Sequence, residues 1–462
     1  MLYDFIMVDK ADRSPLYRQI YRSVRRAIEN GSMKMNSRLP SIRGLSDTLG
    51  VSKTTVIAAY DQLCAEGYIA NRPQKGYFVA ADFQNSPAPF ETKNNYSNIE
   101  NKHYEYDFST KSIDEAIIKF SVWRKEVKDI INRSYLLTSY GDVQGEEALR
   151  NALQKYALGT RSVNARAENI VVGAGTQAIL SLLCSLLGGG KRVAVQEKSF
   201  VQAEYVLRSF GNEIHYFKSD ADGVTVDSLN WIKPQVILIN PNYSGLDGKT
   251  MPVTRRLEII EWADNNNALI IEDDYNGELR YSSHPMPCVQ NYGTEQTVYI
   301  GSFSKVLLPS VRISYMVLPE QLIKKYNDVR ELLNQTASKT EQLALASYIR
   351  SGKIDAHIRK ARRIYLEKSR VMADSLKKHF TESRLIFNET AMYFGVSLPV
   401  EVNRSAIDKD LKNNSVRLMP QHYADNEFGV SFSGIPISKI DDGIALISRI
   451  IHQNTKSKPA AE

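Results

Sequence analysis

The chain has 462 residues, too many for one hydrophobic core, so its length predicts two or three domains. Its apolar content of 43% and charged content of 24% are those of an ordinary soluble globular protein. No apolar run reaches the length of a membrane span and the N-terminus does not resemble a signal peptide, so we expect a cytoplasmic protein without membrane partners. Cys64, Cys184 and Cys288 form no CxxC spacing, which indicates neither a disulfide framework nor a zinc site.

The net charge is +7, and much of this excess lies near the N-terminus. Residues 1–80 contain twelve Lys and Arg against seven Asp and Glu, a surplus of five. A basic end on a near-neutral body suggests an appended module that binds a polyanion. The same charges could equally form a solvated face, so the motifs must decide.

Three helical segments are predicted near the N-terminus. Apolar residues recur at helical spacing from Leu16 to Ile28. Ser41 is the expected N-cap of a short second helix that Gly50 ends, and Ser52 is the expected N-cap of a third. Two short helices joined by a glycine turn are typical of a helix-turn-helix with its recognition helix.

Two short alternating runs, residues 68–70 and 76–79, flank the basic tip at 71–75 and predict a two-stranded wing. The first 80 residues resemble the winged helix-turn-helix of the GntR regulators in the motifs Arg38-Leu39-Pro40-Ser41, Ser52-Lys53-Thr54-Thr55-Val56 and Gly76-Tyr77-Phe78-Val79.

The GntR resemblance implies that residues 1–80 form a head that binds double-stranded promoter DNA. Phosphate contacts would supply affinity and orientation, and the start of the recognition helix would contact base edges. Any single basic residue in the head could also simply be exposed. The residues implied to face DNA are Arg38, Ser41, Arg43, Ser52, Lys53, Thr54, Thr55 and Lys75.

Residues 81–107 lack apolar periodicity and are predicted to be a linker that lets two modules move separately. Beyond it, short apolar runs alternate with helix-length segments, which indicates a largely parallel sheet. The seven runs are 170–172, 192–196, 213–217, 235–240, 268–272, 298–301 and 313–318. Helices dominate from about residue 331, so the body 108–462 should divide into a large part at about 130–330 and a small part at about 331–455.

Two of these runs end in groups suited to a ligand. Gly175 and Thr176 follow a strand and open a helix, an arrangement that can hold a phosphate group. Asp273 and Tyr275 end another strand, at the edge where open α/β sheets bind ligands. Asn242 follows a third run and could reach the same ligand, although a bare Pro-Asn turn would look the same.

Lys305 ends a further apolar run, among the hydroxyl groups of Ser302 and Ser304 and before Arg312. A buried lysine either pairs its ammonium or lowers its pKa, and the second outcome leaves a nucleophilic amine. That is the condition for a Schiff-base lysine, and the serines and the arginine would suit a phosphate. Alone, this stretch could equally be an edge strand followed by a surface lysine.

In this order, the phosphate turn, the acidic strand end and the serine-flanked lysine resemble the aspartate-aminotransferase-like enzymes of pyridoxal-phosphate fold type I. The resemblance implies that Lys305 carries the aldimine, Asp273 pairs with the pyridine nitrogen and Tyr275 bonds the ring oxygen. Phe200 would stack on the ring, or could be plain core. The remaining residues implied to bind the cofactor are Gly175, Thr176, Ser302, Ser304, Arg312 and Asn242.

A GntR-like head joined to an aminotransferase-like body is the arrangement of the MocR regulators, which nearly the whole chain resembles. We therefore expect a multidomain chain: a helix-rich winged head, an α/β fold type I body with a mainly parallel seven-stranded sheet, and a smaller C-terminal α+β domain. The resemblance implies a DNA-binding transcription factor in the bacterial nucleoid, assembled as a head-to-tail homodimer. Its pyridoxal phosphate would respond to an amine, an amino acid or further pyridoxal phosphate. The rival hypotheses are a working aminotransferase with an accessory head, and a regulator without cofactor.

Two features depart from many MocR relatives. Gly429 stands where an arginine commonly clamps the carboxylate of the substrate or effector, and Arg208 lies late for a second such arginine. Ordinary transamination of α-amino acids is therefore less expected. The effector either lacks a conventionally placed carboxylate or is pyridoxal phosphate itself.

Overall fold

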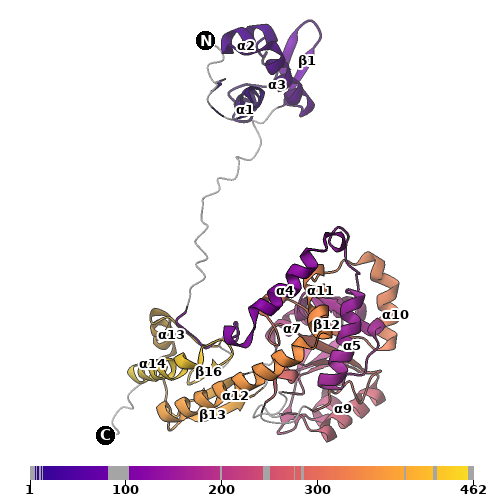
Figure 1. The fold of residues 1–462 in the computed structure, drawn as a ribbon, viewed down its shortest axis with the longest axis vertical. Helices are drawn as coiled ribbons and strands as arrows, with labels where there is room; N and C mark the ends of the chain where they lie inside the picture. Colours follow the sequence, from indigo (N-terminus) through magenta and orange to yellow (C-terminus); the bar gives the residue numbers. More distant parts are fainter. Residues whose placement is uncertain are drawn as a thin grey trace. The chain divides into compact units, whose positions relative to one another are not determined.

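The computed structural model describes residues 6, 8–9, 12, 14–81, 104–197, 200–242, 250–274, 276–281, 286–389, 392–419 and 424–455. The chain divides into two compact units, Met1–Lys102 and His103–Glu462, called here the head and the body (Figure 1). Within the described ranges, no helix is long and apolar enough to cross a membrane.

The head is a three-helix unit with a two-stranded wing. Ser41 and Ser52 cap two of its helices as predicted, each through a side-chain oxygen that accepts a backbone N–H, from Gly44 and Thr55. Gly50 ends the second helix with φ of +60°, a backbone conformation that suits glycine. The elements are α1 Leu16–Glu29, α2 Ile42–Leu49, α3 Lys53–Ala65, β1 Ile69–Arg72 and β2 Gly76–Val79.

The core of the head lies between α1 and α3. Ile20 and Val24 of α1 and Val56 and Leu63 of α3 are fully buried. The polar residues of α1 fall on its opposite face. The apolar face of α1 predicted from the sequence is therefore the face that packs against α3.

The body is built on a seven-stranded sheet in the order β4-β12-β11-β10-β9-β5-β6. Only β12 is antiparallel to its neighbours β11 and β4, whereas the other pairs are parallel. The predicted, mainly parallel sheet is therefore confirmed. The strands are β4 Ile170–Gly173, β5 Arg192–Gln196, β6 Glu213–Phe217, β9 Val236–Ile239, β10 Leu269–Asp273, β11 Thr297–Ser302 and β12 Ser314–Val317.

Successive residues of these strands belong to different cores because strand side chains alternate between the two faces. Val171 and Met316 pack with α6, α7 and α10, whereas Val172 and Tyr315 pack with α5, α11 (Lys339–Arg350) and α12 (Lys353–His379). The helices of this part are α4 Phe120–Ile131, α5 Glu147–Arg161, α6 Thr176–Leu187, α7 Val201–Ser209, α8 Val226–Ile232, α9 Val253–Asn266 and α10 Glu320–Val329. A short hairpin, β7 Ser219–Asp220 and β8 Gly223–Val224, precedes α8.

The C-terminal part of the body is a smaller α+β unit, as predicted. Its antiparallel sheet has the order β13-β14-β16, with β13 Arg384–Asn388, β14 Tyr393–Ser397 and β16 Glu427–Ser431. The 27-residue α12 runs along this part of the body (Figure 1). The helices are α11 Lys339–Arg350, α12 Lys353–His379, α13 Arg404–Asn413 and α14 Ile440–Gln453.

The body begins earlier than residue 108. β3, Tyr106–Asp107, pairs in parallel with β15, Val416–Arg417, and the N–H of Phe108 donates to the carbonyl of Arg417 at 2.8 Å. The last residues of the predicted linker 81–107 are thus bonded to the C-terminal part, and residues 82–103 lie outside the described ranges. We call residues 106–114 the arm.

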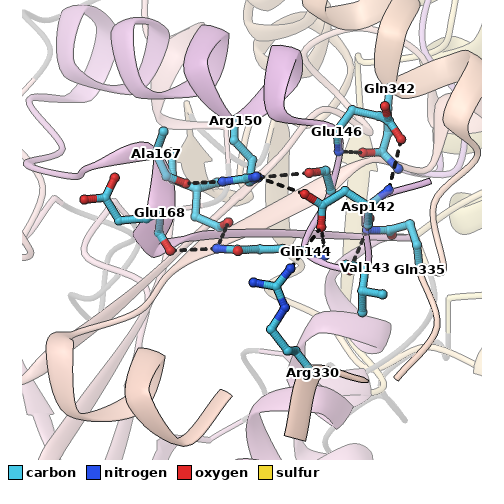
Figure 2. A network of polar contacts seen from close by, with 12 residues as sticks. Asp142, Val143, Gln144, Glu146, Arg150, Ala167, Glu168, Arg330, Gln335 and Gln342 are labelled. Atoms are coloured by element: carbon cyan, nitrogen blue, oxygen red, sulfur yellow. Dashed lines mark hydrogen bonds and ion pairs between the residues drawn. The ribbon is translucent and has the colours of Figure 1, made fainter. Parts of the chain in front are cut away.

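A polar loop covers the outer edge of β4 (Figure 2). The N–H of Val172 donates to the carbonyl of Gln144 at 2.9 Å, and Nε2 of Gln144 donates to the carbonyl of Ile170 at 3.0 Å. Nη2 of Arg150 lies 3.1 Å from Oδ2 of Asp142 and holds the start of the loop. These bonds satisfy backbone groups that an edge strand would otherwise expose. They support the strand that leads to Gly175.

Candidate cofactor site and DNA-binding surface

Three neighbouring strands bring one part of the site together. Gly173 at the end of β4 is in register with Ser314, which in turn is in register with Ser302 at the end of β11. Because β12 runs against both neighbours, the start of β12 lies beside the ends of the other two. Arg312, just before β12, and Gly175, just after β4, therefore meet at one edge of the sheet.

Gly175 and Arg312 are in close contact. A Cβ atom on residue 175 would lie 2.5 Å from Nη2 of Arg312, and Gly175 has a φ of +87°. Gly175 is also the N-cap of α6, whose first residue is Thr176. The guanidinium thus lies at a helix N-terminus, where N–H groups and the helix dipole already favour an anion.

Hydroxyl groups lie along the same edge of the sheet. Ser314 Oγ lies 2.9 Å from Ser302 Oγ, and Ser302 Oγ lies 3.3 Å from Ser304 Oγ. The N–H of Ala174 donates to Thr336 Oγ1 at 2.9 Å. Ser302 and Ser304 were predicted here, whereas Ser314 and Thr336 were missed because isolated hydroxyl residues give no sequence signal. A guanidinium, a helix N-terminus and several hydroxyls form a donor set suited to a phosphate monoester.

Lys305 is buried, with 8% of its surface exposed. Its Nζ donates to the carbonyl of Thr110, to the carbonyl of Ser112 at 3.0 Å and to Oγ of Ser433 at 3.5 Å. Burial lowers the pKa of this amine from 10.5 to about 8, with Lys368 adding to the lowering and Asp107 opposing it. The lysine therefore meets the physical requirement for a reactive amine. Its backbone partners come from the arm.

Asp273 ends β10, in register with Ile300 of β11. Burial, together with the negative charges of Asp274 and Glu272, raises the pKa of its carboxyl group from 3.8 to about 7. A cation beside this carboxylate would lower its pKa again, so the position favours a positively charged partner such as a protonated ring nitrogen. Tyr275 lies outside the described residues.

A buried polar network beside Asp273 was not predicted. Asp274 Oδ2 lies 2.5 Å from Nε of Arg161 and accepts from Tyr299 Oη at 2.7 Å. Asn242 donates its Nδ2 to Oδ1 of Asp274, and its own Oδ1 lies 3.4 Å from Nη2 of Arg161. The network fixes Asn242 beside the end of β10. Arg161 ends an otherwise ordinary amphipathic helix, so no sequence signal marked it.

Phe200 lies at the N-cap of α7 and is partly buried. It packs against the core formed by α6, α7 and α10 on one face of the sheet. Stacking of its ring on a cofactor stays a prediction.

In the head, the cap of α3 gathers several of the residues predicted to face DNA. Ser52 Oγ lies 2.7 Å from both Thr54 Oγ1 and Thr55 Oγ1. Ser52, Lys53 and Thr54 are exposed, and Thr55 is half-buried. The first turn of α3 therefore presents hydroxyls and one ammonium to solvent, as a recognition helix needs.

The remaining predicted residues lie on α2 and at the wing. Ser41 and Arg43 are exposed at the start of α2, and Lys75 is exposed in the turn of the wing. Arg38 is exposed and forms a β-bridge with Phe78 of β2.

Arg72 was missed. Its guanidinium carbon lies 4.6 Å from the centroid of the Phe78 ring, and its Nη2 donates to Asn36 Oδ1 at 2.6 Å.

Family models match both units. Residues 105–445 match "Aminotransferase class I and II", and residues 16–79 match "Bacterial regulatory proteins, gntR family". The archaeal alanine:glyoxylate aminotransferase has 21% identity and a TM-score of 0.68, over 75% of this chain and 91% of its own. This likeness shows the fold of the body.

Three curated relatives extend over both units. The regulator YdeL of Bacillus subtilis is 31% identical over 93% of this chain and 95% of its own length. The probable rhizopine catabolism regulatory protein MocR of Rhizobium meliloti is 28% identical over 88% of this chain and 85% of its own length. The pyridoxine biosynthesis transcriptional regulator PdxR of Corynebacterium glutamicum is 28% identical over 78% of each chain.

The fold and the two matches define a transcription regulator with a DNA-binding head and a pyridoxal-phosphate-binding body of fold type I. The residues present fit such a cofactor, since Lys305 offers a buried amine and Arg312 offers a guanidinium beside Gly175 at the N-terminus of α6. The chain belongs to the MocR-type regulators, and the function predicted from the sequence is confirmed at this level.

Proposed function

We propose that this regulator senses a small amine, or pyridoxal phosphate itself, at Lys305 and changes its binding to promoter DNA accordingly. The observation that carries the proposal is the buried amine of Lys305 with its lowered pKa. It lies on the connection between β11 and β12, which also contains Arg312. Pyridoxal phosphate, when bound, supplies an aldehyde carbon that reacts reversibly with amines. An effector that binds one state of the regulator better than another shifts the populations by that difference in affinity.

Each group of residues has a separate task in this proposal. Lys305 offers the amine and Asp273 keeps a proton at the ring nitrogen. The phosphate is held by Gly175, Thr176, Ser302, Ser304 and Arg312. Tyr275 binds the ring oxygen, Asn242 contacts the cofactor, and Phe200 covers the ring. In the head, the exposed residues on α2, α3 and the wing bind the duplex, with α3 in contact with base edges.

The residues expected to clamp an α-carboxylate are not available for it. Gly429 is paired with Gly395 between β16 and β14 and has no side chain to offer. Arg208 makes two bonds of 3.0 Å to Oε1 of Glu204 on the same helix. This favours an effector without a conventionally placed carboxylate, or pyridoxal phosphate, and it argues against ordinary transamination.

The proposal includes a head-to-tail homodimer in which each body contacts the partner's head. The observation in favour of an interface is a short stretch of the body with several exposed large side chains. Tyr135 and Tyr140 are 71% and 101% exposed, and Leu137 between them is 37% exposed. Large apolar side chains grouped on a surface favour an interface. Light scattering should give twice the chain mass, and a monomeric mass at micromolar concentration would contradict this part.

The deciding experiment titrates the pure protein on its own promoter with pyridoxal phosphate, then with amines and amino acids, and follows operator binding. Absorbance above 400 nm and borohydride labelling of Lys305 report whether the cofactor is bound. A regulator without cofactor would show neither signal. Turnover of amino acids near 1 per second, within the usual enzyme range, would instead favour an aminotransferase with an accessory head.

A further inference from the structure

The arm, residues 106–114, is fastened to the C-terminal part of the body along its first half. Phe108 is fully buried, and its carbonyl accepts from the N–H of Ser431 at 2.8 Å. Gly443 of α14 makes room for it, since a Cβ atom there would lie 2.6 Å from Cζ of Phe108. This half of the arm is a fixed part of the body.

The second half of the arm lies on Lys305. Two arm carbonyls, of Thr110 and Ser112, accept from its Nζ, and Ser433 Oγ lies 3.1 Å from the carbonyl of Ser112. The N–H of Asp114 donates to the carbonyl of Ser433 at 2.9 Å. The amine thus bonds Thr110 and Ser112, Ser433 bonds Ser112 and Asp114, and the two together hold residues 110–114.

An ion pair fastens the end of the arm. Nζ of Lys368, on α12, lies 2.8 Å from Oδ2 of Asp114, and the Lys368 side chain is fully buried. Asp114 also caps the following short helix by accepting from the N–H of Ala116 at 2.9 Å. A buried ammonium whose partner is a carboxylate on the arm is strongly bound there, because separating the two would leave a charge without compensation.

Lys305 cannot keep both of its hydrogen bonds to the arm once its amine has reacted with an aldehyde. When a neutral lysine amine condenses with an aldehyde, a C=N bond replaces the C=O bond and both N–H protons leave with the oxygen as water. The nitrogen then holds at most one proton, so it cannot donate to the carbonyls of both Thr110 and Ser112. Reaction at Lys305 therefore removes at least one bond from the arm. Along the chain, residues 82–103 connect the arm to the helices and the wing of the head.

We propose that the Asp114–Lys368 pair is a positioning pair that holds the arm over Lys305, and that the arm transmits engagement of that amine toward the head. The inference rests on the proposed function, because it needs Lys305 to react with the cofactor. The role assigned to Lys368 is to place Thr110 and Ser112 rather than to touch the cofactor.

The test measures hydrogen exchange of the peptide 104–114 in the full-length protein. In the wild type, saturation with pyridoxal phosphate should speed exchange of the arm amides at least about fivefold, as expected when a charge-assisted hydrogen bond is lost. Lys368→Met should show the fast exchange before any cofactor is added. It should still be labelled at Lys305 by borohydride, and its operator binding should no longer respond to the cofactor.

Two further variants control for folding and charge. The double variant Lys368→Met with Asp114→Asn leaves no unpaired buried charge and should behave like Lys368→Met, whereas Lys368→Arg should restore slow exchange. Lys378→Met removes a lysine of the same helix whose partner, Asp441 at 2.9 Å, lies on the surface, and should behave as wild type.

The outcomes separate the two proposals. Loss of labelling in the wild type would contradict the proposed function. Normal labelling with unchanged exchange of the arm would contradict the transmission proposed here. If the arm amides exchange as slowly in Lys368→Met and in the double variant as in the wild type, with no cofactor added, the pair does not hold the arm. This conclusion does not depend on the chemistry at Lys305.

Discussion

Gly175 lies against the guanidinium of Arg312 so closely that a single added methyl group would be 2.5 Å from its Nη2. The substitution Gly175→Ala should therefore displace Arg312 from the N-terminus of α6. We expect the apparent affinity for pyridoxal phosphate to fall at least about tenfold, because one charge-assisted hydrogen bond is worth about 1.5 to 3 kcal/mol. Titration of the absorbance above 400 nm measures the effect.

A matched control is Gly188→Ala, at the other end of the same helix. Gly188 also has a positive φ, +75°, but nothing lies within 4 Å of its added Cβ. Both variants carry the backbone strain, and only the first has the clash. Equal loss of cofactor affinity in the two variants would mean that strain, and not contact with Arg312, is responsible.

The lowered pKa of Lys305 predicts how the binding rate depends on pH. The neutral amine is the reactive form, and with a pKa of about 8 roughly one molecule in ten holds it at pH 7. The rate at which the absorbance appears should rise about tenfold per pH unit below pH 8 and level off above it. Stopped-flow mixing at several pH values tests this, with Lys305→Ala as the blank. A rate that still rises steeply from pH 9 to pH 10 would place the pKa near its ordinary 10.5.

The Arg161–Asp274 pair should be important for the stability of the body. Arg161→Met leaves the Asp274 carboxylate buried without its cation, and we expect a loss of about 3 to 5 kcal/mol in the free energy of unfolding. Urea unfolding of the body measures it. Adding Asp274→Asn should recover part of the loss by removing the buried charge.

The control is Arg166→Met, which breaks an exposed pair with Glu320 at 2.9 Å. A surface pair contributes about 0 to 1 kcal/mol, so the urea midpoint should hardly move. Similar losses in Arg161→Met and Arg166→Met would show that burial of the Asp274 network does not matter.

Lys53→Ala and Arg43→Ala should weaken operator binding, because both side chains are exposed at the starts of α3 and α2. Each lost phosphate contact should lower the slope of log affinity against log salt by about 0.9, whereas a base contact should instead relax sequence preference. Fluorescence anisotropy at several salt concentrations gives both quantities.

Arg22→Ala changes the same charge on the exposed face of α1, whose other face packs on α3. It should leave the salt slope nearly unchanged. Binding that is insensitive to salt, or equally affected by all three variants, would contradict the assigned surface.

The sequence was most informative for features that depend only on residues close together in the chain. Ser41, Gly50 and Ser52 mark helix ends because caps depend on neighbouring residues, and the structure places all three at such ends. The seven strands were visible because strands buried on both faces are continuous apolar runs. The reversal of β12 was not visible, since an apolar run looks the same in either direction.

Groups that come from distant backbone could not be predicted. The carbonyls that hold Lys305 belong to Thr110 and Ser112, more than 190 residues away, and any residue type supplies a carbonyl. Arg161 was missed for a related reason, because its role depends on Asp274, 113 residues later in the chain. The predicted linker ran too far toward residue 107, since the pairing of β3 involves only Tyr106 and Asp107.

The reversed direction of β12 also sets a constraint on chain length. The connection from β11 to β12 begins at Ser302 and ends at Ser314, which lie opposite each other in the sheet. This connection contains both Lys305 and Arg312. Its ends cannot drift apart, so an inserted or deleted residue would alter the spacing between the amine and the guanidinium rather than shift the strands. Homologues of different loop length at this point should accordingly differ in which aldehyde phosphates they accept, even with every binding residue retained.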